Sequence, residues 1–303
     1  MKLGMPKEIM DGEARVALTP ESALKLQKLG HEIFVEKGAG EASSFADQAY
    51  ADAGVTVVKS AKDLYSQVDV VAKVRPTTSA ELKMMKKGQT LVGFFNPGGD
   101  EAGLKQAETQ GVNVIAMEMV PRISRAQKMD ALSSMANIAG YRAVIEAGNN
   151  FGRFFTGQVT AAGKVPPAKV LVVGAGVAGL AAIGTAQSLG AIVRAFDVRP
   201  EVAEQIESMG AEFLFLDFED DQDGASTGGY AAPSSPEFRE KQLALFLEQA
   251  PEVDIVITTA LIPNREAPEL WTKEMVAAMK PGSVIVDLAA EKGGNCKLTV
   301  ADE

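Results

Sequence analysis

The stretch Lys169–Leu180, KVLVVGAGVAGL, decides the fold of the second half of the chain. An apolar β-like run leads directly into the pattern G-x-G-x-x-G at Gly174, Gly176 and Gly179. Alone the pattern is weak evidence, but a strand before it and a helix after it are the context of a dinucleotide-binding fingerprint. Gly174 permits the tight turn, Gly176 lets the backbone approach a pyrophosphate, and Gly179 lets helix and strand pack closely. The pyrophosphate then lies at the helix N-terminus, where free N–H groups and the helix dipole attract an anion.

A second β-like run at 192–196 ends in Asp197. A carboxylate at this place can accept hydrogen bonds from the adenosine ribose hydroxyls, and it repels the 2′-phosphate of NADP(H). Arg199 lies close in sequence and softens that repulsion. We therefore predict a βαβ unit over 169–197 that binds NAD(H). A glycine-rich packing turn without a ligand is the structural alternative.

Composition narrows the classes of function. The chain has 303 residues and a formal net charge of −10, so it lacks the basic balance that a nucleic-acid surface needs. It contains a single cysteine, Cys296, and a single histidine, His31. Disulfide bonds within the chain are therefore impossible, and acid–base chemistry by histidine is poorly supplied. No metal site is expected. The uncharged stretch 170–193 is long enough to span a bilayer, but its glycines and its strand–turn–helix pattern favour a buried βαβ core.

Strand-like runs alternate with short helical patterns along the whole chain, which predicts parallel α/β architecture. One such helix is Pro20–Leu29, with Thr19 as its N-cap. We expect strands at 3–5, 32–36, 55–58, 68–74, 90–95, 113–117, 169–173, 192–196, 212–216, 254–259 and 283–288. The fold class predicted is two Rossmann-like domains with parallel sheets, linked by a long helix, with a cleft between them. The expected boundaries are 1–125, a linking helical region 126–160, and a nucleotide-binding domain 161–303.

Two segments stand out from this pattern. Residues 217–239 are rich in Asp, Glu, Gly and Pro, and are either a solvated insertion or a mobile lid beside the cofactor. Residues 120–134 are unusually polar for a helix that is expected to run from 124 to 150. There Ser124 and Gln127 fit a capping box, so Gln127 is open to a purely structural role. Alternatively Gln127, Asp130 and Ser133 share one helix face and, with Arg122, suit a sugar and a carboxamide.

Several long motifs together resemble one family. They lie at 121–143, 151–157 (FGRFFTG), 174–179, 195–200 (AFDVRP), 258–263 (TTALIP) and 286–290 (VDLAA). They are similar to the NAD(H)-binding component, domain I, of proton-translocating NAD(P) transhydrogenase, and the resemblance covers essentially the whole chain. It implies an enzyme component that transfers hydride directly between its NAD(H) and NADP(H) held by a partner domain, coupled to proton movement through a membrane domain.

The resemblance also implies site residues. A set at the nicotinamide and its ribose would do the catalytic positioning: Arg122, Gln127, Asp130 and Ser133. Further residues would bind the cofactor: Gln127, Lys128, Met129, Asp130, Gly174, Gly176, Val177, Gly179, Asp197, Val198, Arg199, Gly229, Tyr230, Thr259, Ala260 and Leu261. Tyr230 would belong to a loop that closes over the cofactor, although the residues that follow it, Ala231–Pro236, depart from the family pattern.

Assembly and location follow from the same resemblance. It implies a homodimer that works peripherally to the inner membrane, on the cytoplasmic side in a bacterium, with no nucleic acid as partner. In the family the first domain is completed by a further segment, which we expect to lie beyond Glu303.

Alanine dehydrogenase, a related family, offers a second interpretation. Arg15 and Lys73 match residues that bind pyruvate there, whereas the position of the catalytic histidine is Asn96. Reductive amination needs a tuned acid and base near the substrate carbon, while transfer between two nicotinamides needs only positioning and exclusion of water. The sequence therefore favours the transhydrogenase. A third interpretation is a non-catalytic NAD-binding module.

Overall fold

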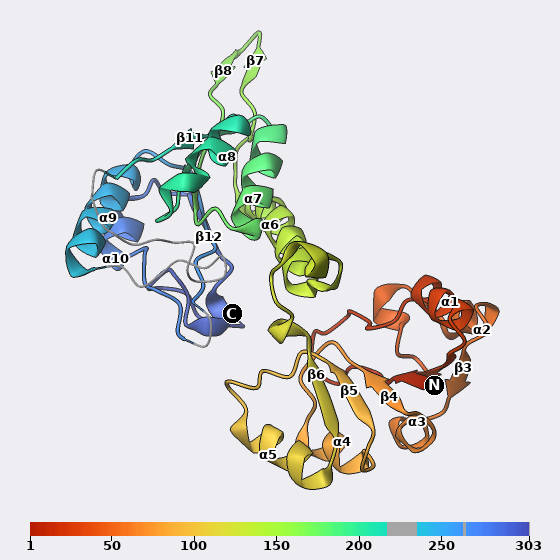
Figure 1. Cartoon of the computed structure of the whole chain (residues 1–303). Helices are drawn as coiled ribbons and strands as arrows, with labels where there is room; N and C mark the ends of the chain where they lie inside the picture. Colours follow the sequence, from red (N-terminus) through yellow and green to blue (C-terminus); the bar gives the residue numbers. More distant parts are fainter. Residues whose placement is uncertain (217–234, 263–264, 303) are drawn as a thin grey trace. The chain divides into compact units, whose positions relative to one another are not determined.

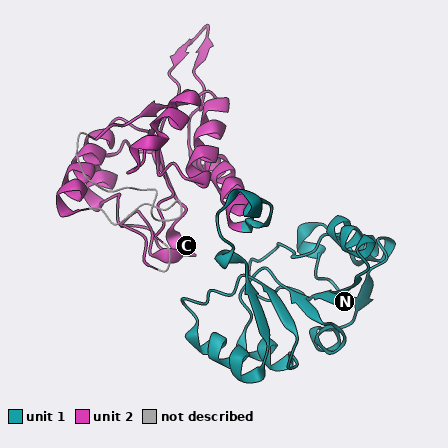
Figure 2. Cartoon of the chain, viewed as in Figure 1, with its two compact units in different colours: residues 1–131 teal, residues 132–303 magenta. Residues whose placement is uncertain are grey.

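The computed structural model describes residues 1–216, 235–262 and 265–302, and divides the chain into two compact units, Met1–Ala131 and Leu132–Glu303 (Figures 1 and 2). Each unit has its own parallel sheet with helices packed against it. The two Rossmann-like domains that the sequence predicts are thereby confirmed. Tyr230, Gly229 and most of the acidic 217–239 segment lie outside the described residues.

The first unit is built on a parallel sheet in the order β3-β2-β1-β4-β5-β6. The strands are β1 (Lys2–Met5), β2 (Glu32–Glu36), β3 (Thr56–Val58), β4 (Val70–Ala72), β5 (Thr90–Gly93) and β6 (Asn113–Ala116). The helices are α1 (Pro20–Lys28), α2 (Asp47–Asp52), α3 (Ala61–Gln67), α4 (Ser79–Met84) and α5 (Glu101–Gln110). The chain adds strands β2 and β3 on one side of β1 and strands β4 to β6 on the other, so the strand order reverses between β1 and β4. Sheets of this kind bind ligands in the crevice beyond the carboxyl ends of the strands at that point.

Local sequence explains where these helices begin and end. Thr19 caps α1 as predicted, with its side chain accepting from the backbone N–H of Ser22. Asp100 caps α5 in the same way, and α5 stops at Gly111, whose φ of 70° suits glycine.

The second unit is built on a parallel sheet in the order β11-β10-β9-β12-β13. Its strands are β9 (Lys169–Val173), β10 (Ile192–Phe196), β11 (Glu212–Phe213), β12 (Ile255–Thr258) and β13 (Val284–Asp287). Its helices are α6 (Ala131–Asn150), α7 (Val177–Ser188), α8 (Ala203–Ser208), α9 (Pro236–Gln249) and α10 (Lys273–Ala278). The strand order reverses between β9 and β12, and the glycine fingerprint directly follows β9. The uncharged stretch 170–193 is the predicted βαβ core, and no helix in the described part of the chain is both long and apolar enough to span a membrane.

A small antiparallel hairpin leaves this unit before the sheet begins. It consists of β7 (Gln158–Thr160) and β8 (Gly163–Val165) and stands out from the second unit in Figure 1. Neither strand is among those expected from the sequence, because a strand of three residues beside Gly and Pro leaves no clear pattern.

The long helix predicted over 124–150 is wrong in its first turns. Residues Ser124–Met129 form a 3-10 helix, Asp130 has φ −78° and ψ 80°, and α6 starts only at Ala131. Aspartate favours the position before a helix, where its carboxylate offsets unsatisfied N–H groups, and this favours a break at residue 130. Gln127, Asp130 and Ser133 therefore do not share a face of one helix.

The structure also contradicts the capping box. Ile123 occupies the N-cap position of the 3-10 helix, Ser124 lies inside it, and no side chain caps it. The side chain of Gln127 is exposed. A capping role therefore does not account for Gln127.

The remaining part of α6 belongs to the core of the second unit. Ala143, Val144 and Ala147 are buried in one hydrophobic cluster with Ala182 and Ile183 of α7. Their small side chains let the two helices approach closely. At the closest point an ideal Cβ on Gly140 would lie 2.0 Å from the carbonyl oxygen of Ala178, so only glycine fits there.

Candidate functional site

The glycine turn after β9 has the backbone geometry that the sequence indicates. Gly174 has a φ of 99°, which disfavours any residue with a Cβ. A Cβ on Gly179 would lie 1.7 Å from the carbonyl oxygen of Gly174, so helix and turn touch through backbone alone. A Cβ on Gly176, by contrast, would meet nothing within 4 Å. The turn therefore leaves open space beside Gly176 and none beside Gly179.

The N-terminus of α7 is suited to an anion. Gly176 is its N-cap, and no side chain caps the helix there. The first N–H groups of a helix have no partner within the helix, and its dipole adds a partial positive charge at this end. Open space beside Gly176 and an uncapped helix end thus fit a pyrophosphate group.

Asp197 lies beside this turn, at the end of β10, and is buried. Its Oδ2 accepts a hydrogen bond of 2.7 Å from the backbone N–H of Ala175. Its Oδ1 accepts one of 2.9 Å from the backbone N–H of Arg199. The carboxylate therefore holds the glycine turn in place, a structural role that sequence reasoning missed because it depends on two strands being neighbours.

Arg199 pairs with the same carboxylate through its side chain. Its Nε lies 2.9 Å from Oδ1 and its Nη2 3.0 Å from Oδ2, and the pairing raises the pKa of Arg199. With four donors, the lone-pair positions of Asp197 are filled. A ribose hydroxyl that binds Asp197 must therefore displace part of this ion pair.

The loop after β12 lies next to the glycine turn, across the reversal point of the sheet. The register pairs Thr258 with Val173, and the N–H of Thr259 donates to the carbonyl of Val173 at 2.9 Å. The hydroxyl of Thr259 lies 3.2 Å from the carbonyl oxygen of Gly174. Thr259, Ala260 and Leu261 are thus brought to the turn by the sheet, while Val198 packs into the hydrophobic cluster behind it.

The other predicted site residues divide between the two units. Arg122, Gln127, Lys128 and Met129 are exposed in the first unit, and Asp130 is half-buried there. Ser133 lies in the first turn of α6, in the second unit. The structure brings the adenosine-side residues together within one unit.

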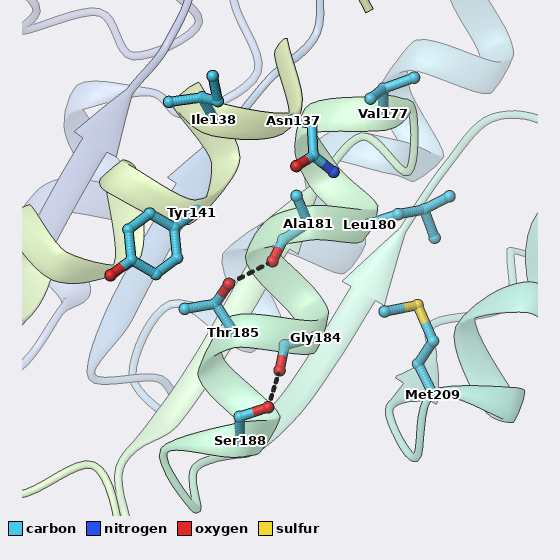
Figure 3. Close-up of a pocket in the computed structure, with 10 residues that line it drawn as sticks. All are labelled: Asn137, Ile138, Tyr141, Val177, Leu180, Ala181, Gly184, Thr185, Ser188 and Met209. Carbon is cyan, nitrogen blue, oxygen red and sulfur yellow. Dashed lines mark hydrogen bonds between the residues drawn. The ribbon is translucent and has the colours of Figure 1, made fainter. Parts of the chain in front are cut away.

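An apolar groove runs between α6 and α7 on the second unit (Figure 3). Ile138 and Tyr141 line it from α6, Leu180 and Gly184 from α7, and Met209 from the residue after α8. The hydroxyls of Thr185 and Ser188 donate to carbonyls of their own helix, at 2.7 and 2.8 Å. These two hydroxyls are therefore satisfied within α7, while Asn137 of α6 adds an amide to a lining that is otherwise mainly apolar.

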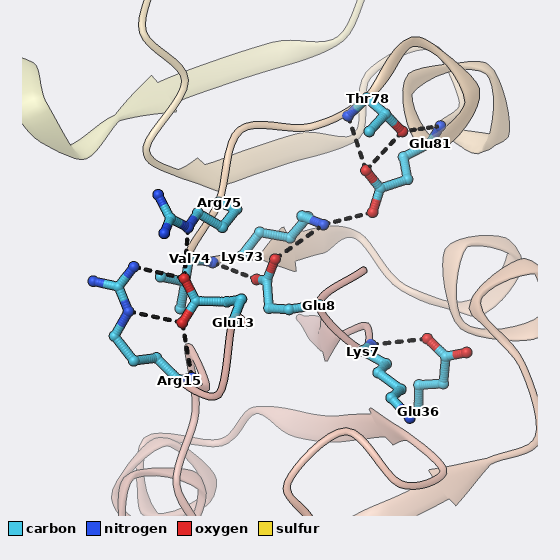
Figure 4. A network of polar contacts seen from close by, with 10 residues as sticks. All are labelled: Lys7, Glu8, Glu13, Arg15, Glu36, Lys73, Val74, Arg75, Thr78 and Glu81. Atoms are coloured by element: carbon cyan, nitrogen blue, oxygen red, sulfur yellow. Dashed lines mark hydrogen bonds and ion pairs between the residues drawn. The ribbon is translucent and has the colours of Figure 1, made fainter. Parts of the chain in front are cut away.

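A second polar cluster lies at the carboxyl ends of β1 and β4 in the first unit (Figure 4). Lys73 is buried, and its Nζ lies 2.5 Å from Glu81 and 3.3 Å from Glu8. Glu13 receives the guanidinium of Arg15 at 2.6 Å and Nε of Arg75 at 2.6 Å. These cations are thus paired with carboxylates of the chain itself.

Electrostatics follow from this pairing. The hydrogen bonds from Arg15 are the main cause that lowers the pKa of Glu13 to about 2.

Asn96 has a φ of 57°, and its N–H donates to Glu118. His31 precedes β2, at the opposite end of the strands from this cluster. In the part of the chain that the structure describes, no group of His, Cys, Asp and Glu side chains could hold a metal ion.

The family described as "Alanine dehydrogenase/PNT, N-terminal domain" matches residues 4–139, and its C-terminal counterpart matches residues 143–303. The chain belongs to the alanine dehydrogenase/PNT family. It is 72% identical, over 303 residues, to the NAD(P) transhydrogenase subunit alpha of Cereibacter sphaeroides. The chain spans 58% of that relative's length.

Among solved structures, this chain is again similar to a transhydrogenase and to an alanine dehydrogenase. A transhydrogenase from Sinorhizobium meliloti matches with a TM-score of 0.87 and 44% identity, over 98% of this chain and 81% of that one. An L-alanine dehydrogenase matches with a TM-score of 0.82 and 31% identity, over 100% of this chain and 78% of that one. Similarity is thus greater to transhydrogenase than to alanine dehydrogenase in these comparisons, and the resemblance drawn from the motifs is confirmed.

Proposed function

We propose that this chain is the NAD(H)-binding component of a proton-translocating NAD(P) transhydrogenase. The observation that carries the proposal is the turn at Gly176, which is open, uncapped and held by the buried Asp197. The name and identity of the Cereibacter sphaeroides relative support the enzyme class. In this assembly the nicotinamide of NAD(H) exchanges a hydride with NADP(H) on a partner domain.

The residues of this chain bind and orient. The N–H groups that open α7 hold the pyrophosphate. Asp197, Val198 and Arg199 bind the adenosine ribose, and the carboxylate of Asp197 accepts hydrogen bonds from the ribose hydroxyls. Thr259, Ala260 and Leu261 line the dinucleotide beyond the turn. Arg122, Gln127, Asp130 and Ser133 orient the carboxamide and ribose at the reacting end, with Lys128 and Met129 beside them. Gly229 and Tyr230 belong to the proposed closing loop, outside the described residues.

The chemistry assigned to these residues is positioning, because hydride transfer between two nicotinamides requires no proton donor from the protein. The single histidine lies at the end of the first sheet opposite the polar cluster. A titratable pair near a substrate carbon, which reductive amination requires, is therefore not supplied by histidine.

Mixing this chain with an NADP(H)-binding partner domain tests the proposal. We expect NADH to reduce an NADP analogue whose reduced form absorbs at its own wavelength, at a rate that depends on both proteins. The partner's nucleotide binding is checked separately by fluorescence. Failure of transfer with both proteins loaded would leave only a non-catalytic NAD-binding module.

Alanine dehydrogenase activity is the control for substrate class. We expect no pyruvate- and ammonia-dependent oxidation of NADH by this chain alone. Lys73 and Arg15, which match pyruvate-binding residues, are paired with Glu8, Glu81 and Glu13 of the chain itself. A substrate carboxylate would have to compete with those buried partners.

The assembly we propose is a homodimer that works at the cytoplasmic face of the inner membrane with a membrane domain and the NADP(H) partner. The membrane domain supplies the proton path, which the residues discussed above do not form. Sedimentation of the purified chain over a range of concentrations measures its association. A mass that stays monomeric at all concentrations would contradict the dimer.

A further inference from the structure

Asn295 connects a distant part of the chain to the loop beside the glycine turn. It lies after β13, in the sequence Gly293-Gly294-Asn295-Cys296, and it is fully buried. None of the motifs considered in the sequence includes it. Its contacts concern Ala260, one of the residues proposed to line the dinucleotide.

The side-chain amide of Asn295 makes the two hydrogen bonds that a neighbouring strand would make to the backbone of Ala260. Its Oδ1 accepts from the N–H of Ala260 at 3.0 Å, and its Nδ2 donates to the carbonyl of Ala260 at 2.9 Å. Nδ2 also donates to the carbonyl of Pro268 at 2.8 Å. Ala260 has just left β12, so its backbone groups have no ladder partner. The asparagine therefore satisfies both of them and fixes the path of the loop.

The backbone of Asn295 anchors it in turn. Its carbonyl accepts from the N–H groups of Leu270 and Trp271, at 2.8 and 2.9 Å. The segment is then held to the sheet by Asp287, the last residue of β13. Oδ2 of Asp287 accepts from the N–H of Cys296 at 2.9 Å and from the hydroxyl of Thr299 at 2.6 Å.

Hydrogen bonds joined by short stretches of backbone thus connect Asp287 to the glycine turn. Asp287 holds the segment of Asn295, Asn295 holds Ala260, and the neighbouring Thr259 contacts the carbonyl of Gly174 at 3.2 Å. The amide of Asn295 is fully buried with its hydrogen bonds satisfied, which makes its part of this connection rigid.

We propose that Asn295 is a positioning residue for NAD(H), because it sets where the Thr259–Leu261 backbone meets the bound dinucleotide. This inference rests on the proposed function, since it requires that the loop lines the cofactor. Asn295 contacts the loop and not the cofactor, so its effect on NAD(H) binding is indirect.

The amide of Asn295 supplies the one acceptor and the two donors that this role needs. Replacement by aspartate keeps the shape but exchanges two N–H donors for a carboxylate that faces two carbonyl oxygens. At low pH a neutral carboxylic acid regains one O–H donor. The Asn295→Asp variant should therefore recover part of its function as the pH falls, which a general loss of stability would not produce.

The experiment compares the wild-type chain with Asn295→Asp and the control Asn113→Asp. Asn113 also donates to a carbonyl, that of Gly88 at 3.3 Å, but it lies on β6 of the first unit. Hydrogen exchange of the peptide that contains Ala260 reports the loop, and titration with NADH reports binding. Fluorescence of Trp271, the single tryptophan, verifies that the buried region is folded.

We expect Asn295→Asp to exchange faster at Ala260 and to bind NADH about 10-fold more weakly at pH 8, because two carbonyls lose their donor and face a carboxylate instead. The defect should shrink at pH 5, and wild type and Asn113→Asp should show no such gain. Faster exchange with unchanged NADH affinity would overturn the inference, and so would unchanged exchange. If wild type itself fails to bind NADH, the proposed function fails, while the exchange data still measure the loop.

A milder variant covers the case in which Asn295→Asp does not fold. Thr299→Val removes one hydrogen bond to Asp287 and keeps the side-chain shape. We expect faster exchange at Ala260 and an NADH affinity reduced about 3-fold. Faster exchange with wild-type affinity in this variant would likewise overturn the proposal.

Discussion

Asp197 combines two tasks in one carboxylate. It anchors the backbone of the glycine turn through Ala175, and it is paired with Arg199. Its charge is thus largely compensated in the absence of a ligand. Discrimination between NAD(H) and NADP(H) therefore depends on the pair, and both members can be tested.

Removal of the carboxylate should change cofactor choice. We expect Asp197→Ala to weaken NADH binding by about 10-fold or more, because a hydrogen-bonded charged acceptor for the ribose is lost. NADPH binding should fall less, because repulsion of its 2′-phosphate is lost as well. Fluorescence titration with both nucleotides measures this, with the exposed Asp11→Ala as control. Equal losses for the two nucleotides would contradict this account of cofactor choice.

Gln127 can be separated from helix capping. We expect Gln127→Asn to lower hydride transfer with the partner domain far more than NADH affinity, since the shorter side chain no longer orients the carboxamide. No side chain caps the 3-10 helix, so thermal stability should stay within about 0.5 kcal/mol of wild type. Stopped-flow transfer and thermal unfolding give the two quantities. A loss confined to stability would restore the capping interpretation.

The low pKa of Glu13 makes a prediction about acid stability. The folded-state pKa of about 2 lies below the ordinary value of 4.5, because Arg15 and Arg75 hold the charged form. The contribution to stability is therefore present above pH 4.5 and is lost as the pH falls toward 2. It amounts to on the order of 3 kcal/mol for a shift of this size.

Urea unfolding at pH 7 and pH 3.5 measures that contribution. The variant Glu13→Gln should lose stability at pH 7 and show a flatter dependence between the two pH values. Glu21→Gln, which removes an exposed pair with Lys25, serves as control. An unchanged pH dependence in Glu13→Gln would show that the pairing does not contribute.

At the scale of elements, the glycine turn separates binding from folding. Gly176 faces open space with an ordinary φ of −73°, whereas Gly179 faces the carbonyl of Gly174. We expect Gly176→Ala to keep the melting temperature and to weaken NADH binding, because its methyl group occupies the space of the pyrophosphate. Gly179→Ala should destabilise the protein by about 3 kcal/mol or more, because the backbone must move.

Gly184→Ala is the matched control on the same helix. Its Cβ would meet only the flexible end of Met209 at 2.8 Å, so α7 should tolerate it. Calorimetry and NADH titration of the three variants test the series. Normal binding by Gly176→Ala would mean that the phosphate lies elsewhere.

At the scale of the molecule, each unit has hydrophobic clusters of its own. Residues such as Leu64 and Leu91 form the core of the first unit, and Val172 and Ile257 lie in the second. We expect the fragment 132–303 to fold alone and to bind ADP-ribose within about 10-fold of the whole chain, because the glycine turn, Asp197 and Ala260 lie within it.

That fragment should transfer no hydride with the partner domain. Arg122, Gln127 and Asp130 lie in the first unit and are missing from it. Circular dichroism establishes folding, and calorimetry gives the affinity. Transfer by the fragment would remove these residues from the mechanism.

Local sequence was sufficient for much of this protein. The apolar run before Gly174, the spacing of three glycines and the alternation of strands with helices predicted the βαβ unit and both parallel sheets. These features depend on neighbouring residues, so a single sequence carries them. The break at Asp130 was missed because the helical pattern on either side of it continues without a strong breaker.

Tertiary structure decided which distant residues meet. Parallel strands far apart in the chain place Thr259 beside Gly174, Asp197 beside Ala175, and Asn295 around Ala260. Lys73 between Glu8 and Glu81 is a further case, since the sequence favoured a structural role for Lys73 but could not name the carboxylates that pair with it. Hydrogen bonds and ion pairs of this kind depend on strand order and burial, which no local pattern records. The glycine turn was therefore determined by the sequence, and the contacts that hold it were determined by the fold.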